Sequence, residues 1–291
     1  MEMVYAMTWP EALAAKAAAP DLLPIAGGTD VMVEINFDRR RPAGLLDLTR
    51  VEELATWSVV DDTVVLGAGV SYTRVVEELS GLLPGLGMAS RTIGSRQIRN
   101  RGTVGGNLGS ASPAGDAHPP LLAAGAVVEV ESVRGVRRVP VGDFFVGVKR
   151  SVLAPDELIR AVQIPCATGP EQFSKIGTRN AMVIAVASFA LRLDGGSRRV
   201  GTGIGSAAPT PRVAADAEAF LCGELESAGA WESRAAIAPS VVHRFGELVA
   251  SAAAPIDDVR GSAAYRRHAL EVMARRTLTW GWDEYRNGVA A

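Results

Sequence analysis

The sequence predicts an α+β protein built from about two domains. The chain has 291 residues, and one domain usually takes roughly 150. Strand and helix patterns mix in the first half, whereas the second half shows one hairpin pattern followed by three helical stretches. Between the halves, residues 167–170 read Ala-Thr-Gly-Pro, which is typical of a turn or linker. We therefore expect one domain over residues 1–168 and a second over residues 169–291.

Capping and turn signals place the elements of the first half. A Ser or Thr before an apolar-periodic stretch predicts a helix start, and paired Asp residues between two Val-rich runs predict a hairpin. The expected elements are a helix from about residue 8 to before Pro20, a strand at 22–25, a short helix begun by a capping box of Thr49 and Glu52, a hairpin of 59–60 and 63–66 around Asp61 and Asp62, and a helix capped by Ser71. Residues 92–120 have few regular-structure formers and are expected to be mostly loop.

Period-two alternation and turn residues place the elements of the remaining chain. Strands are expected at 127–133 and 136–139 around a turn at 134–135, at 158–164, and at 188–193 and 199–206 around Asp194-Gly195-Gly196. Helices are expected near 212–221, 239–250 and 262–278. A sheet-and-helix half followed by a hairpin and three helices is an α+β arrangement.

The composition argues against several classes of function. The 30 Lys and Arg residues nearly balance 32 Asp and Glu, and no basic stripe is interleaved with aromatic residues, so we expect no nucleic-acid partner. The two cysteines, Cys166 and Cys222, form no Cys-x-x-Cys or Cys/His group, so we expect the chain to hold no zinc or iron–sulfur cluster. Residues 1–13 lack the pattern of a secretory signal, and the most apolar stretch, 181–191, is too short to span a membrane. We therefore expect a cytoplasmic protein.

Two glycine-rich segments are the strongest candidates for a ligand site. Residues 24–30 read Pro-Ile-Ala-Gly-Gly-Thr-Asp after a predicted strand, and residues 102–107 read Gly-Thr-Val-Gly-Gly-Asn. Paired glycines let backbone N–H groups approach an anion closely, so two such nests could hold a pyrophosphate from both sides. The simpler alternative is that each pair only makes a tight turn. Neither segment matches G-x-G-x-x-G or G-x-x-x-x-G-K-[ST], which disfavours a Rossmann-type fold and a P-loop.

No catalytic residue is predicted. Ser112, Asp116 and His118 could be combined into a triad on paper, but the sequence contains no nucleophile elbow. The other histidines, His243 and His268, lie on expected helices and are interpreted as surface or partly buried residues.

Several segments together make the sequence resemble a known family. They are Ala26-Gly27-Gly28-Thr29-Asp30, Gln97-Ile98-Arg99-Asn100, Gly102-Thr103-Val104-Gly105-Gly106-Asn107-Leu108, Pro113-Ala114-Gly115-Asp116, Lys175-Ile176-Gly177-Thr178-Arg179, and the runs at 206–211 and 258–266. In this order and spacing they resemble the FAD-binding (medium) subunit of the molybdenum hydroxylases, the xanthine dehydrogenase and carbon monoxide dehydrogenase group. The resemblance covers nearly the whole chain. The second glycine segment with its Gln-Ile-Arg-Asn lead-in is its most specific part.

The resemblance implies a fold and a function. The fold would be a vanillyl-alcohol-oxidase-type (PCMH-type) FAD-binding domain, with subdomains of about 1–57 and 58–168, followed by a CO-dehydrogenase-flavoprotein-like C-terminal domain. The function would be that of an oxidoreductase subunit that carries FAD non-covalently and passes electrons from iron–sulfur clusters to NAD, oxygen, a quinone or a carrier protein. A small iron–sulfur subunit and a large molybdopterin subunit would supply the other cofactors, in a dimer of heterotrimers.

The resemblance also assigns residues to FAD. The pyrophosphate would be held by Pro24, Ile25, Ala26, Gly27, Gly28, Thr29, Asp30 and Val31, and by Thr103, Val104, Gly105, Gly106 and Asn107. Asp116 would hydrogen-bond the adenosine part, Ile93 would pack near the ring system, and Ile159 and Lys175 would line the cofactor pocket. As alternatives, Asp116 could cap a turn before Pro119 and Pro120, and Lys175 could be a solvated lysine at a strand edge.

Two other functions are left open. A self-sufficient flavoenzyme, either an oxidase or a reductase like the cell-wall enolpyruvyl reductases, would reduce its flavin with its own substrate. The Ser/Glu proton-donor motif of those reductases is absent from the sequence. A flavin-free assembly protein would have kept the fold without the cofactor, and the intact glycine segments argue against it.

Overall fold

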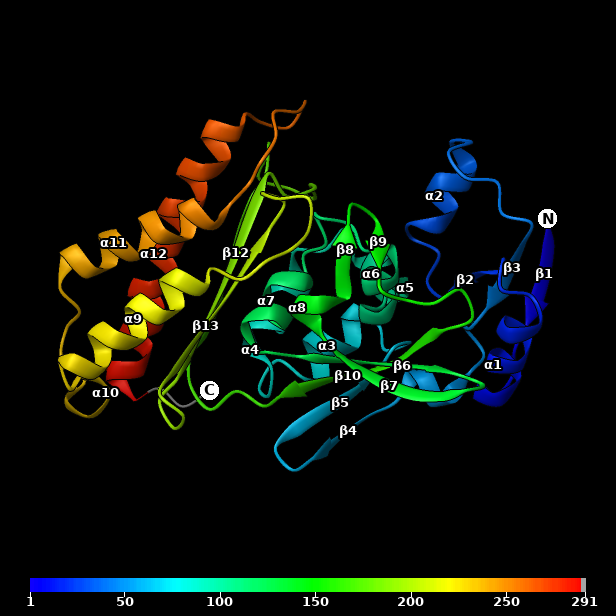
Figure 1. Ribbon diagram of the computed structural model, residues 1–291, viewed down its shortest axis with the longest axis horizontal. Helices are drawn as coiled ribbons and strands as arrows, with labels where there is room; N and C mark the ends of the chain where they lie inside the picture. Colours follow the sequence, from blue (N-terminus) through cyan, green and yellow to red (C-terminus); the bar gives the residue numbers. More distant parts are fainter. Residues whose placement is uncertain (289–291) are drawn as a thin grey trace. The chain divides into compact units, whose positions relative to one another are not determined.

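The computed structural model describes residues 1–288 and forms two compact units (Figure 1). Unit 1 contains Met1–Val75, Ile93–Ser112 and Ala126–Pro165, and unit 2 contains Val76–Thr92, Pro113–Gly125 and the described residues from Cys166 on. The chain therefore passes between the units several times. The boundary after residue 168 and the subdomain limits stay predictions, because the units follow contacts and not one cut in the sequence.

Unit 1 begins with a small parallel sheet. Its strands, in the order β1-β3-β2, are β1 Glu2–Tyr5, β2 Leu23–Ile25 and β3 Gly44–Asp47. Parallel strands need crossover connections, and α1 (Trp9–Ala18) and α2 (Val31–Asn36) lie in them. The predicted start of α1 is confirmed, because the Thr8 hydroxyl accepts a hydrogen bond from the Glu11 N–H.

A five-stranded antiparallel sheet makes up most of the rest of unit 1. Its order is β4-β5-β10-β6-β7, with β4 Trp57–Val60, β5 Thr63–Gly67, β6 Val127–Ser132, β7 Gly135–Pro140 and β10 Leu158–Pro165. The predicted β4–β5 hairpin is confirmed, and Asp61 and Asp62 both have positive φ, 47° and 57°. Two consecutive left-handed residues match the twist of the flanking strands, which explains this two-residue turn.

Short helices and one small hairpin complete unit 1. They are η1 Glu52–Ala55, the start of α3 (Tyr72–Glu78), α5 Arg96–Arg101, α6 Val104–Ser110, α8 Val141–Phe144, β8 Phe145–Gly147 and β9 Arg150–Ser151. The Thr49 capping box is wrong: η1 has no side-chain cap, and the Thr49 N–H itself donates to the Asp47 carboxylate. The prediction that 92–120 is mostly loop is also wrong. Helices of six or seven residues are too short to show a clear apolar period.

Unit 2 is a three-stranded antiparallel sheet with helices on both faces (Figure 1). Its strands are β11 Glu171–Ile176, β12 Ala187–Asp194 and β13 Arg199–Gly205, and its helices are α4 Pro84–Arg91, α7 His118–Ala123, α9 Ala215–Ser227, α10 Ala230–Ser233, α11 Pro239–Ala252 and α12 Ala263–Asn287. Helix α12 packs on β11 and β12, and α9 packs on β13, whereas α7 and α4 cover the other face. All residues of β12 except the last are buried, which explains its apolar sequence.

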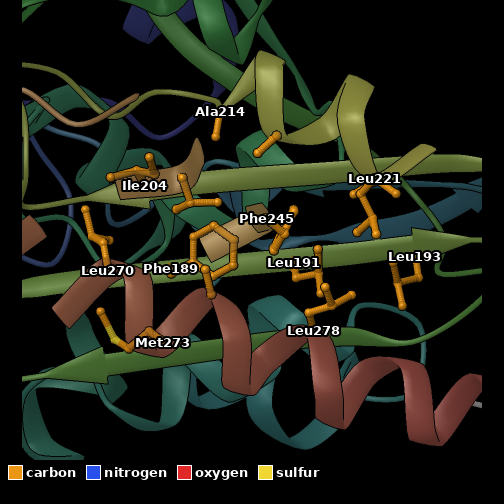
Figure 2. Close-up of a cluster of buried hydrophobic side chains, with 14 of the residues drawn as sticks. Phe189, Leu191, Leu193, Ile204, Ala214, Leu221, Phe245, Leu270, Met273 and Leu278 are labelled. Carbon is orange, nitrogen blue, oxygen red and sulfur yellow. The ribbon is translucent and has the colours of Figure 1, made fainter. Parts of the chain in front are cut away.

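The core of unit 2 lies between β12 and the C-terminal helices. Figure 2 shows Phe189 and Leu191 of β12 facing Phe245 of α11 and Leu270 and Leu278 of α12. The rings of Phe189 and Phe245 meet edge to face, with centroids 6.3 Å apart. Each large apolar side chain buried here contributes about 1.5–3 kcal/mol to folding.

Two of the three predicted C-terminal helices differ from the structure by more than two residues in their limits, whereas α11 only continues to Ala252 instead of residue 250. Helix α9 begins later than the predicted residue 212 and continues to Ser227. Helix α12 begins as predicted after Ser262, whose hydroxyl accepts from the Tyr265 N–H, but it continues to Asn287. Its last turns pack Trp282 against Trp231 of α10, which a local sequence pattern cannot reveal. Among the residues that the structure describes, none forms a helix long and apolar enough to cross a membrane.

Candidate cofactor site

The first glycine segment is a strand end, a bend and a helix start. Pro24 and Ile25 belong to β2 and Val31 begins α2, so the loop itself is residues 26–30. Gly28 has φ +74°, a left-handed conformation that favours glycine. Within residues 1–288, no hydrogen bond uses the backbone N–H groups of residues 27–31. A run of unused N–H donors beside a left-handed glycine is an anion-binding nest.

The second glycine segment lies directly against the first, within unit 1. A Cβ at Gly27 would stand 1.9 Å from the Arg101 carbonyl oxygen, so only glycine allows this approach. The Ser110 hydroxyl at the end of α6 donates a hydrogen bond of 2.7 Å to Asp30. The structure therefore brings the two predicted segments together.

The second segment is the first turn of α6 and not a second nest. Thr103 is its N-cap, and its hydroxyl accepts from the Gly106 N–H at 2.9 Å. The Gly105 N–H donates to the Ala68 carbonyl at 3.2 Å, and the Asn107 N–H donates to the Thr103 carbonyl at 3.0 Å. The N–H groups of Gly105 and Gly106 are therefore already used by packing and by the helix cap. That this segment helps to hold the FAD pyrophosphate stays a prediction.

The two glycines of this turn have different surroundings. A Cβ at Gly105 would lie 2.5 Å from the Ala68 Cβ and 2.6 Å from its carbonyl oxygen, so Gly105 is needed for packing. Gly106 is exposed, and a Cβ there would meet only the Thr103 hydroxyl, at 3.0 Å. Gly106 therefore presents bare backbone on the outer side of α6.

Two further predicted residues, Ile93 and Ile159, lie in unit 1. The Arg99 guanidinium donates to the carbonyl oxygens of Ile93 and Gly94, at 3.2 and 3.3 Å, and so ties α5 to the segment before it. Ile159 is 8% exposed on β10, and an ideal Cβ at Gly109 of α6 would lie 3.9 Å from its Cδ1. The sequence alone could not predict this role of Arg99, because the carbonyl groups that it binds cannot be located from side-chain identity.

Asp116 and Lys175 form a buried ion pair within unit 2. The Lys175 Nζ lies 2.5 Å from the Asp116 Oδ2, and the two side chains are 8% and 9% exposed. Lys175 Nζ also donates to the Thr92 carbonyl at 3.2 Å. Lys175 is therefore not a solvated strand-edge lysine. Asp116 is not a turn cap either, because no backbone N–H among residues 1–288 donates to its carboxylate.

The other carboxylate oxygen of Asp116 is an acceptor without a donor. Oδ1 is buried, and no hydrogen-bond partner for it lies among residues 1–288. Burial raises the pKa of Asp116 to about 6, although the charge of Lys175 and side-chain contacts with Lys175 and Thr92 lower it. The Thr92 hydroxyl itself donates to the Ala89 carbonyl at 2.8 Å. A buried acceptor costs free energy unless it is paired. The arrangement therefore fits a ligand that supplies a hydroxyl or amino donor.

The structure was also searched for clusters of side chains that could bind a metal ion. Residues 1–288 contain no group of three or more His, Cys, Asp or Glu side chains that could hold a metal ion. Cys166 and Cys222 form no disulfide within residues 1–288.

Comparisons with known proteins match both halves of the chain. Residues 1–167 match the family model described as the FAD binding domain in molybdopterin dehydrogenase. Residues 172–280 match the CO dehydrogenase flavoprotein C-terminal domain.

The chain is also similar to individual proteins of known name. The nicotine 6-hydroxylase medium subunit of Paenarthrobacter nicotinovorans is 31% identical over 259 residues, which cover 87% of each chain. The nicotinate dehydrogenase FAD-subunit of Eubacterium barkeri is 36% identical over 169 residues, covering 56% of this chain and 57% of that subunit. Among solved structures, a carbon monoxide dehydrogenase from Hydrogenophaga pseudoflava that lacks the Mo-pyranopterin moiety has a TM-score of 0.88 and 26% identity, over 98% of both chains.

These matches confirm the predicted α+β fold, an FAD-binding domain followed by a CO-dehydrogenase-flavoprotein C-terminal domain. The chain therefore belongs to the FAD-binding medium subunits of the molybdopterin hydroxylases, the xanthine and carbon monoxide dehydrogenase family of oxidoreductases.

Proposed function

We propose that this chain binds FAD non-covalently and carries electrons between the iron–sulfur clusters of a partner subunit and an external acceptor. The observation that carries the proposal is the run of unused N–H groups at residues 27–31, held against α5 and α6 by the close approach at Gly27. Family membership supplies the identity of the anion that this nest would bind.

The pyrophosphate of FAD is the part that fits the nest. It is doubly charged, and several backbone N–H dipoles pointing at one anion can stabilise it without a basic side chain. Residues 24–31 would surround it on one side, with the exposed backbone at Gly106 and the side chains of Thr103 and Asn107 on the α6 side.

The adenosine part of FAD carries the hydrogen-bond donors that Asp116 lacks. Its ribose hydroxyls and its adenine amino group are donors, and Asp116 Oδ1 is a buried acceptor without one. We keep Ile93 as the residue proposed to pack near the ring system, and Ile159 as a lining residue. Val104 and Gly105, which are buried, would support the α6 turn from behind.

FAD, when bound, would supply the redox chemistry, accepting electrons from the partner's clusters and releasing them to the acceptor. The chain's own residues would bind and orient the cofactor and limit its exposure to water. No side chain of this chain is proposed as a general acid or base.

The proposed complex contains a small iron–sulfur subunit and a large molybdopterin subunit, as a dimer of heterotrimers. The relatives include medium subunits, which shows that such chains work alongside others. The acceptor, whether NAD, oxygen, a quinone or a carrier protein, is left to experiment. The cytoplasmic location stays a prediction.

Mixing the FAD-loaded chain with its chemically reduced iron–sulfur subunit, without oxygen, tests the electron path. We expect the visible absorption band of the flavin to bleach, and to return when an acceptor is added. A flavin that stays oxidised while the clusters stay reduced would contradict the proposal. Bleaching by an organic substrate with the chain alone would instead favour a self-sufficient flavoenzyme.

A further inference from the structure

Helix α2 has an apolar sequence, Val-Met-Val-Glu-Ile-Asn, yet none of its residues is buried. Met32 and Val33 are 37% and 46% exposed, and Phe37, which ends the helix, is 70% exposed. An amphipathic helix normally buries its apolar stripe against the rest of its domain. Packing within unit 1 therefore does not explain why this helix is apolar.

The β8–β9 hairpin of unit 1 extends the exposed apolar surface of α2. Val146 and Val148 are 52% and 59% exposed. The side chain of Lys149, which follows Val148 in the turn, forms an ion pair with Glu34 of α2, so the hairpin and the helix lie side by side (Figure 1). We call the exposed side chains of residues 32–41 and 146–150 the α2–hairpin surface.

The α2–hairpin surface is also basic. Its exposed cations are Arg39, Arg40, Arg41, Lys149 and Arg150. Its acids are Glu34, which pairs with Lys149 and lies 3.6 Å from Arg40, and Asp38, which pairs with Arg41. Five positive charges against two negative charges leave this surface at +3, although the whole chain carries −2.

Apolar and cationic groups are mixed within this surface. The Arg39 guanidinium lies over the Phe37 ring, 5.5 Å from its centroid. Exposed aromatic and aliphatic side chains that alternate with Arg and Lys are typical of protein segments that lie at the boundary between lipid headgroups and acyl chains. Arginine also binds phosphate groups through two parallel hydrogen bonds.

We propose that the α2–hairpin surface binds reversibly to a membrane surface that contains anionic lipids. Phe37, Val146 and Val148 enter the headgroup region, and the arginines at 39–41 contact lipid phosphates. All of these residues belong to unit 1. The inference does not use the assignment of FAD, so it stands or falls independently of the proposed function.

Two other occupants fit this surface less well. In a two-fold dimer, the same surface of a second copy would bring a charge of +3 against +3. A stable protein partner needs about 800 Å² of complementary surface on each side, whereas α2 has six residues and the strands β8 and β9 have three and two. A bilayer surface needs no complementary shape, only apolar groups beside basic ones.

Sedimentation of the full chain with lipid vesicles tests the proposal. The chain should bind vesicles of equimolar phosphatidylcholine and phosphatidylglycerol, and bind much less to phosphatidylcholine alone. Added NaCl should weaken the binding, because salt screens exposed charges. Each basic residue near an anionic membrane contributes about five-fold to binding, so Arg39→Gln combined with Arg40→Gln should weaken it on the order of 25-fold. Phe37→Ser should weaken it by about 10-fold, because an apolar ring no longer leaves water.

Unit 2 offers a matched control for each change. Arg267→Gln combined with Arg276→Gln removes the same charge from exposed positions of α12. Ile256→Ser removes an apolar side chain that is 66% exposed, close to the 70% of Phe37. Both controls should bind the anionic vesicles nearly as the wild type does. The melting temperature should change little in all four variants, because every substituted side chain is exposed.

Each other result would overturn the inference. A wild type that does not bind the anionic vesicles, or binds both kinds equally, contradicts lipid binding through this basic surface. Equal losses in the α2 variants and in the unit 2 controls would show that only net charge matters. The chain purified together with its native partner subunits provides the last test. If that assembly no longer binds the vesicles, or if the α2 variants fail to assemble, the α2–hairpin surface is a protein interface.

Discussion

Gly27→Ala should break the close contact between the first glycine segment and the end of α5. The added Cβ would stand 1.9 Å from the Arg101 carbonyl oxygen and 2.4 Å from its carbonyl carbon. Both are backbone atoms that cannot rotate away, so one of the two segments has to move. The nest at residues 27–31 would then lose the geometry proposed for pyrophosphate binding.

The size of the effect follows from two opposing contributions. Overpacking of this kind destabilises the folded state by about 1–3 kcal/mol. Replacing Gly by Ala stabilises the folded state by about 0.4–1 kcal/mol, because it lowers the conformational entropy of the unfolded chain. The close approach to backbone favours the upper part of the first range, so we expect a net loss of about 2 kcal/mol. At roughly 2–4 °C for each kcal/mol, the melting temperature should fall by about 4–8 °C.

Thermal unfolding followed by circular dichroism, together with the ratio of released FAD to protein, measures both consequences. Gly109→Ala in α6 is the matched control, because its Cβ would lie 3.9 Å from Ile159 Cδ1, an ordinary contact. That variant should be neutral or more stable by about 0.5–1 kcal/mol, as usual for a helical glycine. A Gly27→Ala chain with the melting temperature and FAD content of the wild type would refute the reasoning.

Three further outcomes are expected. Gly106→Ala should change the melting temperature little, because the gain from placing alanine in a helix offsets the tight contact of 3.0 Å between its Cβ and Thr103 Oγ1. It should weaken FAD binding in calorimetry, and unchanged affinity would remove Gly106 from the site. The FAD affinity should fall as the pH drops through about 6, because Asp116 has a raised pKa of about 6 and gains a proton there. Its protonated carboxyl group is no longer purely an acceptor. An FAD affinity that does not vary with pH would contradict this role. Arg192→Met should lower the free energy of unfolding in urea by about 3–5 kcal/mol, because it leaves the buried Glu171 carboxylate without the partner 3.1 Å away, and a loss below about 1 kcal/mol would be inconsistent with that pairing.

Local signals predicted the elements that local chemistry determines. The β4–β5 turn follows from Asp61 and Asp62, and the starts of α1 and α12 follow from Thr8 and Ser262. Strands β1 and β3 were not predicted, because each is only four residues long and is defined by its partner strand. The same is true of β11, which pairs with β12.

The sequence predicted which segments form the candidate site, but not their hydrogen bonds and contacts. The glycine pairs marked the right segments, and the structure places them side by side in unit 1. Sequence could not show that α6 uses the N–H groups of Gly105 and Gly106 internally, because hydrogen-bond accounting depends on the backbone path. Nor could it show that Lys175 and Asp116 meet, since their contact joins residues far apart in the chain.

The visible absorption spectrum of the purified chain, with chromatographic identification of the nucleotide released by acid, tests the central claim most directly. The account predicts a yellow protein that releases FAD in a ratio close to one per chain. A colourless chain that also fails to take up added FAD would contradict it, and would mean that this member of the family has kept the fold without the cofactor.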